Sequence, residues 1–334
     1  MWLLVSNPTA RSGLAANRLE GAVALLAAHG VEVAVLATLP HGGTVGAVAA
    51  ALQSGAASGS PYRGVIAMGG DGTFHEVANG LLRSGVRADG DVIPLALLPA
   101  GTGNNQARAL GLPLEDLEAA VARIAAGNTT PMDGARVTAW DEHGALLGEA
   151  WAFDSVGFGF SARALRYRFE DKAEVEQMPL WRAIYRDELV YAGALVRALV
   201  GSSFEDHRFD AQVTTVHGTR LYEDLHDLVV NNTRFYARAW VLDPTSRHDD
   251  GEMELVAIRG LDEWAERALV DLDGSPFRDW FDAAPALLRA AWFDLELRER
   301  PAGPPIPAQV DGEPWPAVRR VRIEVAQGAI RVVV

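Results

Sequence analysis

The residues best suited to chemistry form a glycine-rich turn, Gly69–Thr73, with the sequence Gly-Gly-Asp-Gly-Thr. Glycine readily adopts positive φ and lets main-chain N–H groups approach a ligand, so we expect Gly69, Gly70 and Gly72 to act in this way. Such a turn at the start of a helix attracts anions, because the unpaired amides and the helix dipole act together. A carboxylate beside phosphate needs a metal ion or a transferable proton between them. Asp71 therefore predicts a phosphate site with Mg²⁺ or acid–base chemistry.

The segments on either side of this turn predict a strand and a helix. Residues 64–68 are apolar and short, as in a buried strand, and the apolar residues over 74–82 recur at helical spacing. Thr73 and Glu76 have the spacing of a capping box, so a plain strand-to-helix turn is the alternative. We expect the capping box and the phosphate site to coexist. Glycine turns are common, so this stretch alone leaves nucleotide binding open.

Two further polar turns have the same setting. Residues 6–13 follow a strand-like segment over 2–5, and residues 99–105 follow another over 93–98. Strand and helix signals alternate from the start of the chain to about residue 126, which predicts a parallel sheet with helices on both faces. In such sheets ligands bind at the carboxyl ends of the strands, where all three turns lie.

The sequence changes in character near residues 128–131. Helical periodicity fades, and short segments with period-two alternation follow at 135–140, 150–158, 209–216, 253–258, 291–297 and 318–334. We predict an α/β nucleotide-binding domain over residues 1–130 and a mostly β, sandwich-like domain over 131–334. Helices are expected in the second domain at about 179–200 and 261–271.

Composition narrows the function classes. The chain has 334 residues, is 49% hydrophobic and contains no cysteine, which suits a soluble protein of two domains and excludes thiolate catalysis and zinc–thiolate sites. The formal net charge of -14 disfavours nucleic-acid binding. No signal-peptide pattern precedes the first strand, and the most apolar run, 189–200, is too short to span a bilayer. These observations predict a cytoplasmic location.

Three motifs in order carry a family resemblance. They are Asn7-Pro8 with Ser12-Gly13; Gly69–Thr73 followed by Glu76-Val77 and Asn79–Leu81; and Pro99 with Gly101–Asn104, Ala107 and Leu110-Gly111. Weaker matches follow at Gly157–Gly159 with Ala162, at Asn231, Pro244 and Asp250-Gly251, and at Val310–Glu313. Together these motifs resemble the diacylglycerol kinase catalytic-domain superfamily, and within it the soluble bacterial lipid kinases related to sphingosine kinases. NAD kinases and phosphofructokinases share the Gly-Gly-Asp-Gly-Thr motif and the nucleotide-binding architecture, but the other motifs favour the lipid-kinase branch.

The chain departs from the family pattern at three positions. Leu14 follows Ser12-Gly13 where the family often has a basic residue, and Arg11 is the candidate to supply that charge. Asn105 and Ser161 stand where the family often has aspartate. The first departure concerns the phosphate contacts, and the other two concern the acceptor side.

The resemblance implies an ATP- and Mg²⁺-dependent kinase that phosphorylates a lipid hydroxyl, with diacylglycerol as the leading acceptor. The residues that it assigns to the nucleotide are Asn7, Thr9, Arg11, Gly70, Gly72, Thr73, Gly101, Thr102 and Asn104. Asp71 would hold Mg²⁺, partly through water, although in some relatives the matching aspartate is regarded as the base. Asp250 lies where relatives hold a second cation, and a solvated turn is an equal alternative.

The pair Asp311-Gly312 by itself predicts a hairpin turn. The resemblance adds catalysis: Glu313 becomes the general base for the lipid hydroxyl, and Asp311 a supporting carboxylate. The two domains are then expected to enclose a cleft that receives ATP from one and the acceptor from the other.

Two other functions remain open. One is a kinase for a soluble acceptor such as NAD or a sugar phosphate, and the other is a nucleotide-binding module without catalysis. Leu14 and Asn105 favour the inactive module slightly, whereas Asp71, Asp311 and Glu313 argue against it. The expected partners are ATP, a lipid and, transiently, the membrane surface, so that the protein is peripheral to the membrane when it acts. Core packing is the preferred role of the helix expected near 180–199, with a lipid entrance or membrane contact as the alternative, and a homodimer is left open.

Overall fold

The computed structural model describes residues 1–6, 14–88, 90–101, 104–141, 143–167, 207–236, 240–260, 262–263, 288–300, 303 and 305–334. The chain divides into two compact units. The first consists of Met1–Gly134, Arg247–Gly251 and Ala326–Val334, and the second of Ala135–Ser246 and Glu252–Val325. The helix expected at 179–200, and most of that expected at 261–271, lie outside the described residues. In the described part of the chain, no helix is both long and apolar enough to cross a membrane.

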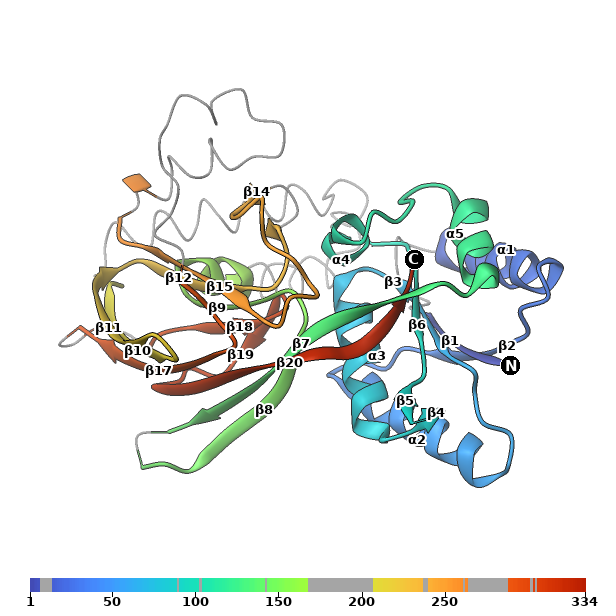
Figure 1. Cartoon of the computed structure of the whole chain (residues 1–334), viewed down its shortest axis with the longest axis horizontal. Helices are drawn as coiled ribbons and strands as arrows, with labels where there is room; N and C mark the ends of the chain where they lie inside the picture. Colours follow the sequence, from blue (N-terminus) through green and yellow to red (C-terminus); the bar gives the residue numbers. More distant parts are fainter. Residues whose placement is uncertain are drawn as a thin grey trace, which may run out of the picture. The chain divides into compact units, whose positions relative to one another are not determined.

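Strands and helices alternate in the first unit, as the sequence predicts (Figure 1). The elements are β1 (Trp2–Ser6), α1 (Leu14–Ala28), β2 (Val33–Ala37), α2 (Gly43–Ala57), β3 (Val65–Gly69), α3 (Asp71–Ser84), β4 (Arg87–Ala88), β5 (Asp91–Val92), β6 (Leu95–Pro99), α4 (Asn105–Ala109) and α5 (Leu117–Ala126). The sheet runs β6-β3-β1-β2 with parallel pairing, and the last part of β20 (Arg320–Val333) joins β6. Because β6, β3 and β1 are neighbours, the three strands that precede the polar turns end side by side.

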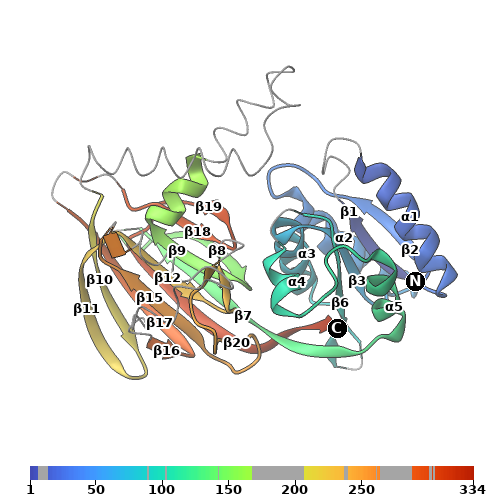
Figure 2. The same cartoon turned by 90° about the horizontal axis from the view of Figure 1, so that it is seen from above.

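The helices of the first unit cover both faces of its sheet (Figure 2). Helices α1 and α5 contact each other over one face, and α2 and α3 pack together on the other. The α1–α5 side forms a hydrophobic cluster that includes Leu26 and Val121 from the helices and Leu4, Ile66 and Leu98 from the strands. Burial of this apolar surface fixes the strands whose ends carry the turns.

The second unit is built mostly of antiparallel strands. Its elements are β7 (Thr129–Trp140), β8 (Leu146–Ala152), β9 (Ser155–Gly159), β10 (Phe209–Thr215), β11 (Gly218–Leu225), β12 (Asp227–Asn231), β13 (Phe235–Tyr236), β14 (Trp240–Val241), β15 (Met253–Ile258), β16 (Leu288–Ala290), β17 (Trp292–Glu299), β18 (Ala308–Val310), β19 (Glu313–Trp315) and β20. One sheet runs β11-β10-β17-β20 and continues through β7 and β8; the other runs β16-β15-β12-β9-β18-β19. The single strand expected over 150–158 is wrong, because the chain bends at residues 153–154 and passes from β8 to β9.

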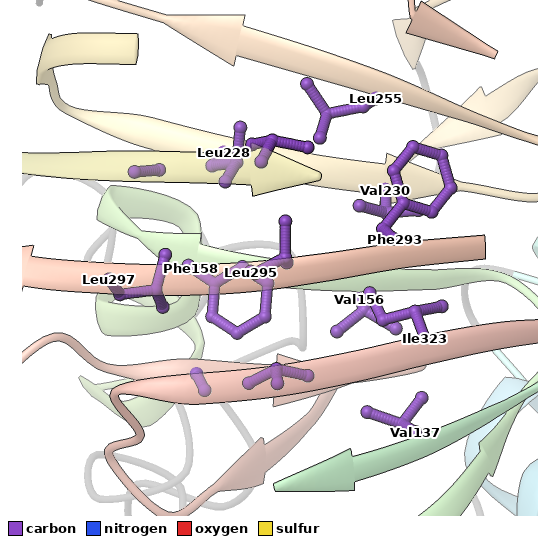
Figure 3. Close-up of a cluster of buried hydrophobic side chains, with 14 of the residues drawn as sticks. Val137, Val156, Phe158, Leu228, Val230, Leu255, Phe293, Leu295, Leu297 and Ile323 are labelled. Carbon is purple, nitrogen blue, oxygen red and sulfur yellow. The ribbon is translucent and has the colours of Figure 1, made fainter. Parts of the chain in front are cut away.

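The two sheets of the second unit share one hydrophobic core (Figure 3). Phe158, Leu228 and Leu255 come from one sheet, while Phe293 and Leu295 come from the other. Along β17 every second residue is buried in this core and the residues between them are not, which is the period of a half-buried strand. The predicted fold class, an α/β unit with a parallel sheet followed by a sandwich-like β unit, is confirmed.

A buried ion cluster lies near β15 and β16 in the second unit. Asp243 is 3% exposed, and Arg289 binds its carboxylate while also pairing with Glu254 at 3.3 Å. Thr245 donates to Asp243 from its backbone N–H at 2.8 Å and from its hydroxyl at 2.7 Å. Burial acts to raise the pKa of Asp243, but the hydrogen bonds from Arg289 and Thr245 outweigh it and hold this pKa below its ordinary value of 3.8.

The lowered pKa of Asp243 predicts how stability depends on pH. The folded protein binds this proton more weakly than the unfolded chain, so the stabilisation is complete above the unfolded pKa and is lost as the pH falls through the folded pKa. We expect the melting temperature of the wild type to fall more steeply than that of Asp243→Asn as the pH drops from about 5 to about 2. Thermal melts over this range test it, with the exposed Asp262→Asn as the control. Parallel curves for the wild type and Asp243→Asn would contradict it.

Candidate functional site

The second of the three polar turns along the chain, Gly69–Thr73, joins β3 to α3, and none of its glycines is left-handed. Gly70 is the N-cap of α3 with φ −98°, and neither Gly69 nor Gly72 has positive φ, so the expected conformation is wrong. Glycine is required by close contact instead: a Cβ on Gly69 would lie 2.2 Å from the hydroxyl oxygen of Thr73. The expected capping box is also wrong, because α3 begins at Asp71 and its N-cap makes no side-chain bond.

The third turn packs directly against the second. A Cβ on Gly101 would lie 2.3 Å from the Cα of Gly70, and the Ala100 N–H donates to the Gly69 carbonyl at 2.8 Å. Asn104 closes this turn at φ 54°: its Oδ1 accepts from the Gly101 N–H at 3.2 Å, and its Nδ2 donates to the Gly101 carbonyl at 3.0 Å. The side chain of Asn104 therefore shapes the turn. The two glycine turns form one continuous backbone surface.

Asp71 connects these two turns. It is the first residue of α3, half-buried, and its Oδ1 accepts the Gln106 N–H from α4 at 3.2 Å. The helix dipole favours a negative charge at this end of α3. A half-exposed carboxylate whose oxygens can each accept more than one bond suits Mg²⁺, which combines one or two carboxylates with water and phosphate oxygens. Among the described residues no group of three or more His, Asp or Glu could hold a metal ion.

Residues 7–13 of the first turn lie outside the described residues, as does Thr102. The predicted roles of Asn7, Thr9, Arg11 and Thr102 therefore stay predictions. The elements around that turn are described: β1 ends at Ser6 beside Met68 of β3, and Arg18 of α1 donates to the Pro99 carbonyl at 2.9 Å. The segments before and after the first turn thus contact the strands that carry the other two.

The contact between Gly70 and Gly101 gives a direct test of this site. Gly101→Ala would force the two backbones apart, because its Cβ meets a Cα rather than a movable side-chain end. We expect a loss of about 1–3 kcal/mol in the free energy of unfolding and a fall in ATP affinity of about tenfold or more. Gly46→Ala in α2, where a Cβ meets open space, is the control and should leave ATP binding unchanged. Titration calorimetry measures the ATP affinity of both variants. Equal affinities for the two variants would refute the packing argument.

In the second unit, Asp311 and Gly312 form the turn between β18 and β19. Both have positive φ, 51° and 81°, as in a type I′ turn, so the predicted hairpin is present. The Asp311 carboxylate, 7% exposed, accepts three backbone N–H groups: from Phe153 at 2.9 Å, Asp154 at 2.8 Å and Ser155 at 3.0 Å. Glu313 begins β19 and is half-buried. Asp311 thus anchors the hairpin, while Glu313 follows it directly.

The segment with Asp250 belongs to the first unit. Asp250 is exposed, and its neighbour Asp249 makes a bidentate pair with Arg247 at 3.0 and 3.1 Å, which lowers the pKa of Asp249. The segment is fastened by Asp133, whose buried carboxylate accepts the N–H groups of Gly251 at 2.6 Å and of Gly328 at 2.7 Å. Burial raises the pKa of Asp133 despite these two bonds. The suggested metal role of Asp250 stays a prediction.

Sequence reasoning missed several buried polar residues. Asp133 holds three segments together. The others lie at the start of β9, after the end of β12 and in the middle of β18: Asp154, Ser155, Asn232, Thr233 and Gln309. Within this group Thr233 donates to the Asp154 carboxylate at 2.9 Å, and Asn232 donates to the Phe153 carbonyl at 2.9 Å. The run Asn231–Thr233 directly after an apolar strand was a usable signal, because polar residues at strand ends usually have a structural or functional partner.

The sequence of this chain is similar to those of several known proteins. Residues 1–137 match the family model of the diacylglycerol kinase catalytic domain. A probable lipid kinase YegS-like protein of Pseudomonas aeruginosa (strain UCBPP-PA14) is 29% identical over 316 residues, which cover 95% of this chain and 89% of that protein. A diacylglycerol kinase of Mycobacterium tuberculosis (strain CDC 1551 / Oshkosh) is 29% identical over 252 residues, 75% of this chain and 71% of the relative.

The fold is also found in a solved structure. The crystal structure of a diacylglycerol kinase from Bacillus anthracis str. Sterne superposes with a TM-score of 0.67 at 22% identity, and the match covers 99% of this chain and 96% of that one. This likeness shows a shared fold, and the family match lies on the unit that carries all three turns. Residues 1–137 thus match the diacylglycerol kinase catalytic domain model, and most of the chain is similar in sequence to proteins named lipid kinase and diacylglycerol kinase.

Proposed function

We propose that this protein transfers the γ-phosphoryl group of ATP to the hydroxyl of a lipid, with diacylglycerol as the acceptor and phosphatidic acid as the product. The observation that carries the proposal is the junction of the second and third turns, where Gly70 and Gly101 touch and Asp71 reaches α4. The names of the relatives, lipid kinase and diacylglycerol kinase, support the choice of acceptor.

The nucleotide phosphates would lie against the continuous backbone of the two glycine turns. Gly70 and Gly72 would offer N–H groups without side chains that keep a ligand away, and α3 begins at this point. Gly101, whose N–H donates to Asn104, would contribute by its small size. Thr73 is buried against Gly69, so we assign its hydroxyl a part in shaping the turn as well as in phosphate binding. Asn7, Thr9, Arg11 and Thr102 complete the proposed nucleotide set.

Asp71 is proposed to orient the divalent cation. Mg²⁺, when bound, would neutralise charge on the β- and γ-phosphates. The chain's own contribution is a carboxylate whose direction is fixed by the Gln106 N–H and by its place at the N-terminus of α3. A preorganised charge of this kind contributes more to catalysis than one that must reorient during the reaction.

Glu313 is proposed as the general base. It would accept the proton of the lipid hydroxyl while the hydroxyl oxygen attacks the γ-phosphorus and ADP leaves. Asp311 would not act on the substrate itself, since its two oxygens are occupied by three backbone N–H groups. It would hold the hairpin from which Glu313 extends.

An acceptor panel tests the proposal. Purified protein, labelled ATP and Mg²⁺ are incubated with diacylglycerol, a sphingoid base, NAD and a sugar phosphate, the lipids being supplied in mixed micelles. We expect transfer to diacylglycerol. Transfer only to NAD or the sugar phosphate would favour the soluble-acceptor reading, and ATP binding without transfer to any acceptor would favour the inactive module. Sedimentation with lipid vesicles would test the accompanying proposal that the protein works at the membrane surface from the cytoplasm.

A further inference from the structure

Gln309, in the middle of β18, makes two side-chain hydrogen bonds, one to the Asp-Gly turn and one to the neighbouring strand. It is 1% exposed. Its side-chain oxygen accepts the Gly312 N–H at 2.7 Å, and its side-chain nitrogen donates to the Ser155 hydroxyl at 3.2 Å. The same side chain thus connects the residue directly before Glu313 to strand β9.

The neighbouring strand leaves room for this side chain. Gln309 lies opposite Gly157 in the β9–β18 pairing. A Cβ on Gly157 would be 2.7 Å from Nε2 of Gln309 and 3.2 Å from its Cγ. A side chain at position 157 would therefore displace the Gln309 amide, so the glycine and the glutamine depend on each other.

The hairpin does not need Gln309 in order to close. Asp and Gly both tolerate the positive φ of a type I′ turn, and this pair is a strong hairpin signal by itself. Burying an amide is costly unless it is hydrogen-bonded, so a buried glutamine is not a neutral choice beside a turn that would form anyway. What Gln309 adds is a fixed position for Gly312, and hence for the chain as it enters β19.

We propose that Gln309 is a positioning residue for Glu313. Asp311 holds the turn to the backbone of residues 153–155, and Gln309 holds it to Ser155 through the side chains. Because both contacts hold the turn, the backbone that leads from Gly312 into Glu313 has one fixed direction. Catalytic groups need support of this kind, because small displacements of a reacting group are costly. This inference rests on the proposed role of Glu313 as the base.

The main test is Gln309→Met, which keeps the approximate volume and removes both hydrogen bonds. We expect kcat to fall on the order of tenfold to a hundredfold, with KM for ATP unchanged and the pH dependence of kcat altered. Gln212→Met, at a half-buried glutamine of β10 in the other sheet, is the control and should keep both wild-type values. A wild-type kcat and pH profile for Gln309→Met would overturn the proposal.

A second pair of variants reports on the same contact. Gly157→Ala should lower kcat, because its Cβ collides with the Gln309 amide. In a Gln309→Ser background the collision is absent, so adding Gly157→Ala should change kcat little. Equal effects of Gly157→Ala in both backgrounds would contradict the proposed contact. Melting temperatures will show whether Gln309→Met folds. If it does not, the Gly157→Ala comparison in the two backgrounds tests the proposal instead.

Glu313→Gln separates this inference from the proposed function. If Glu313→Gln keeps the wild-type kcat, the base assignment fails, and the positioning role fails with it. If Glu313→Gln is inactive while Gln309→Met is unaffected, only the positioning role is overturned. We expect both single variants to be impaired, and the double variant to be no slower than Glu313→Gln alone, as residues that act through one another are not additive.

Discussion

Replacing Asp71 with asparagine is expected to lower phosphoryl transfer on the order of a thousandfold, the scale seen when a preorganised electrostatic group is lost from an active site. Asparagine keeps an oxygen that can accept the Gln106 N–H, so the junction between α3 and α4 should survive. What disappears is the negative charge at the start of α3. The variant therefore separates the chemistry of Asp71 from its structural contact.

Asp116→Asn is the matched control for Asp71→Asn. Asp116 is also a carboxylate at a helix N-terminus in the same unit, where it caps α5 by accepting the Ala119 N–H at 2.9 Å. Asparagine caps helices about as well as aspartate, so activity and melting temperature should stay near wild type. Initial rates with labelled ATP and the best acceptor, together with thermal melts, give both quantities. Comparable rates for the Asp71 and Asp116 variants would show that Asp71 has no role in phosphoryl transfer.

Asp311→Ala is expected to destabilise the second unit strongly. The change leaves the N–H groups of residues 153–155 buried without their acceptor and places alanine at φ 51°. Each buried donor without a partner costs about 1–3 kcal/mol, so a loss on the order of 3–5 kcal/mol in the free energy of unfolding is expected after partial relaxation. Asp311→Asn, which tolerates this φ and keeps an acceptor oxygen, should lose less.

Asp141 provides the comparison for Asp311. It lies in the turn between β7 and β8 and accepts the N–H groups of His143 and Ala145, both at 2.8 Å, in bonds that are exposed to solvent. Water can replace the carboxylate there, so Asp141→Ala should be much milder than Asp311→Ala. Urea unfolding followed by tryptophan fluorescence measures the difference. Similar midpoints for the two alanine variants would show that the Asp311 bonds contribute little.

The general arrangement was predictable because it depends on local patterns. Alternating strand and helix signals placed the three turns at the ends of parallel strands, and the period-two pattern of Phe293, Leu295 and Leu297 identified a sandwich strand. The role of the glycines was not predictable, because the atom that excludes a side chain at Gly101 belongs to Gly70, in another turn. Asp133 and Gln309 were missed for the same reason. Asp133 binds Gly251 and Gly328, and Gln309 binds Ser155. These partners are far away in the sequence and come close only in the fold, which a single sequence does not show.

The last strand has a consequence for how the protein is made. Val332 of β20 pairs with Leu95 of β6, and residues 326–334 belong to the same unit as the three turns. During synthesis, β6 therefore remains an unpaired sheet edge until the ribosome has translated the whole second unit. Exposed strand edges promote misassociation between chains. Residues 1–137 should therefore be expressed as part of the complete chain, because a fragment cut after residue 137 would keep that edge open permanently.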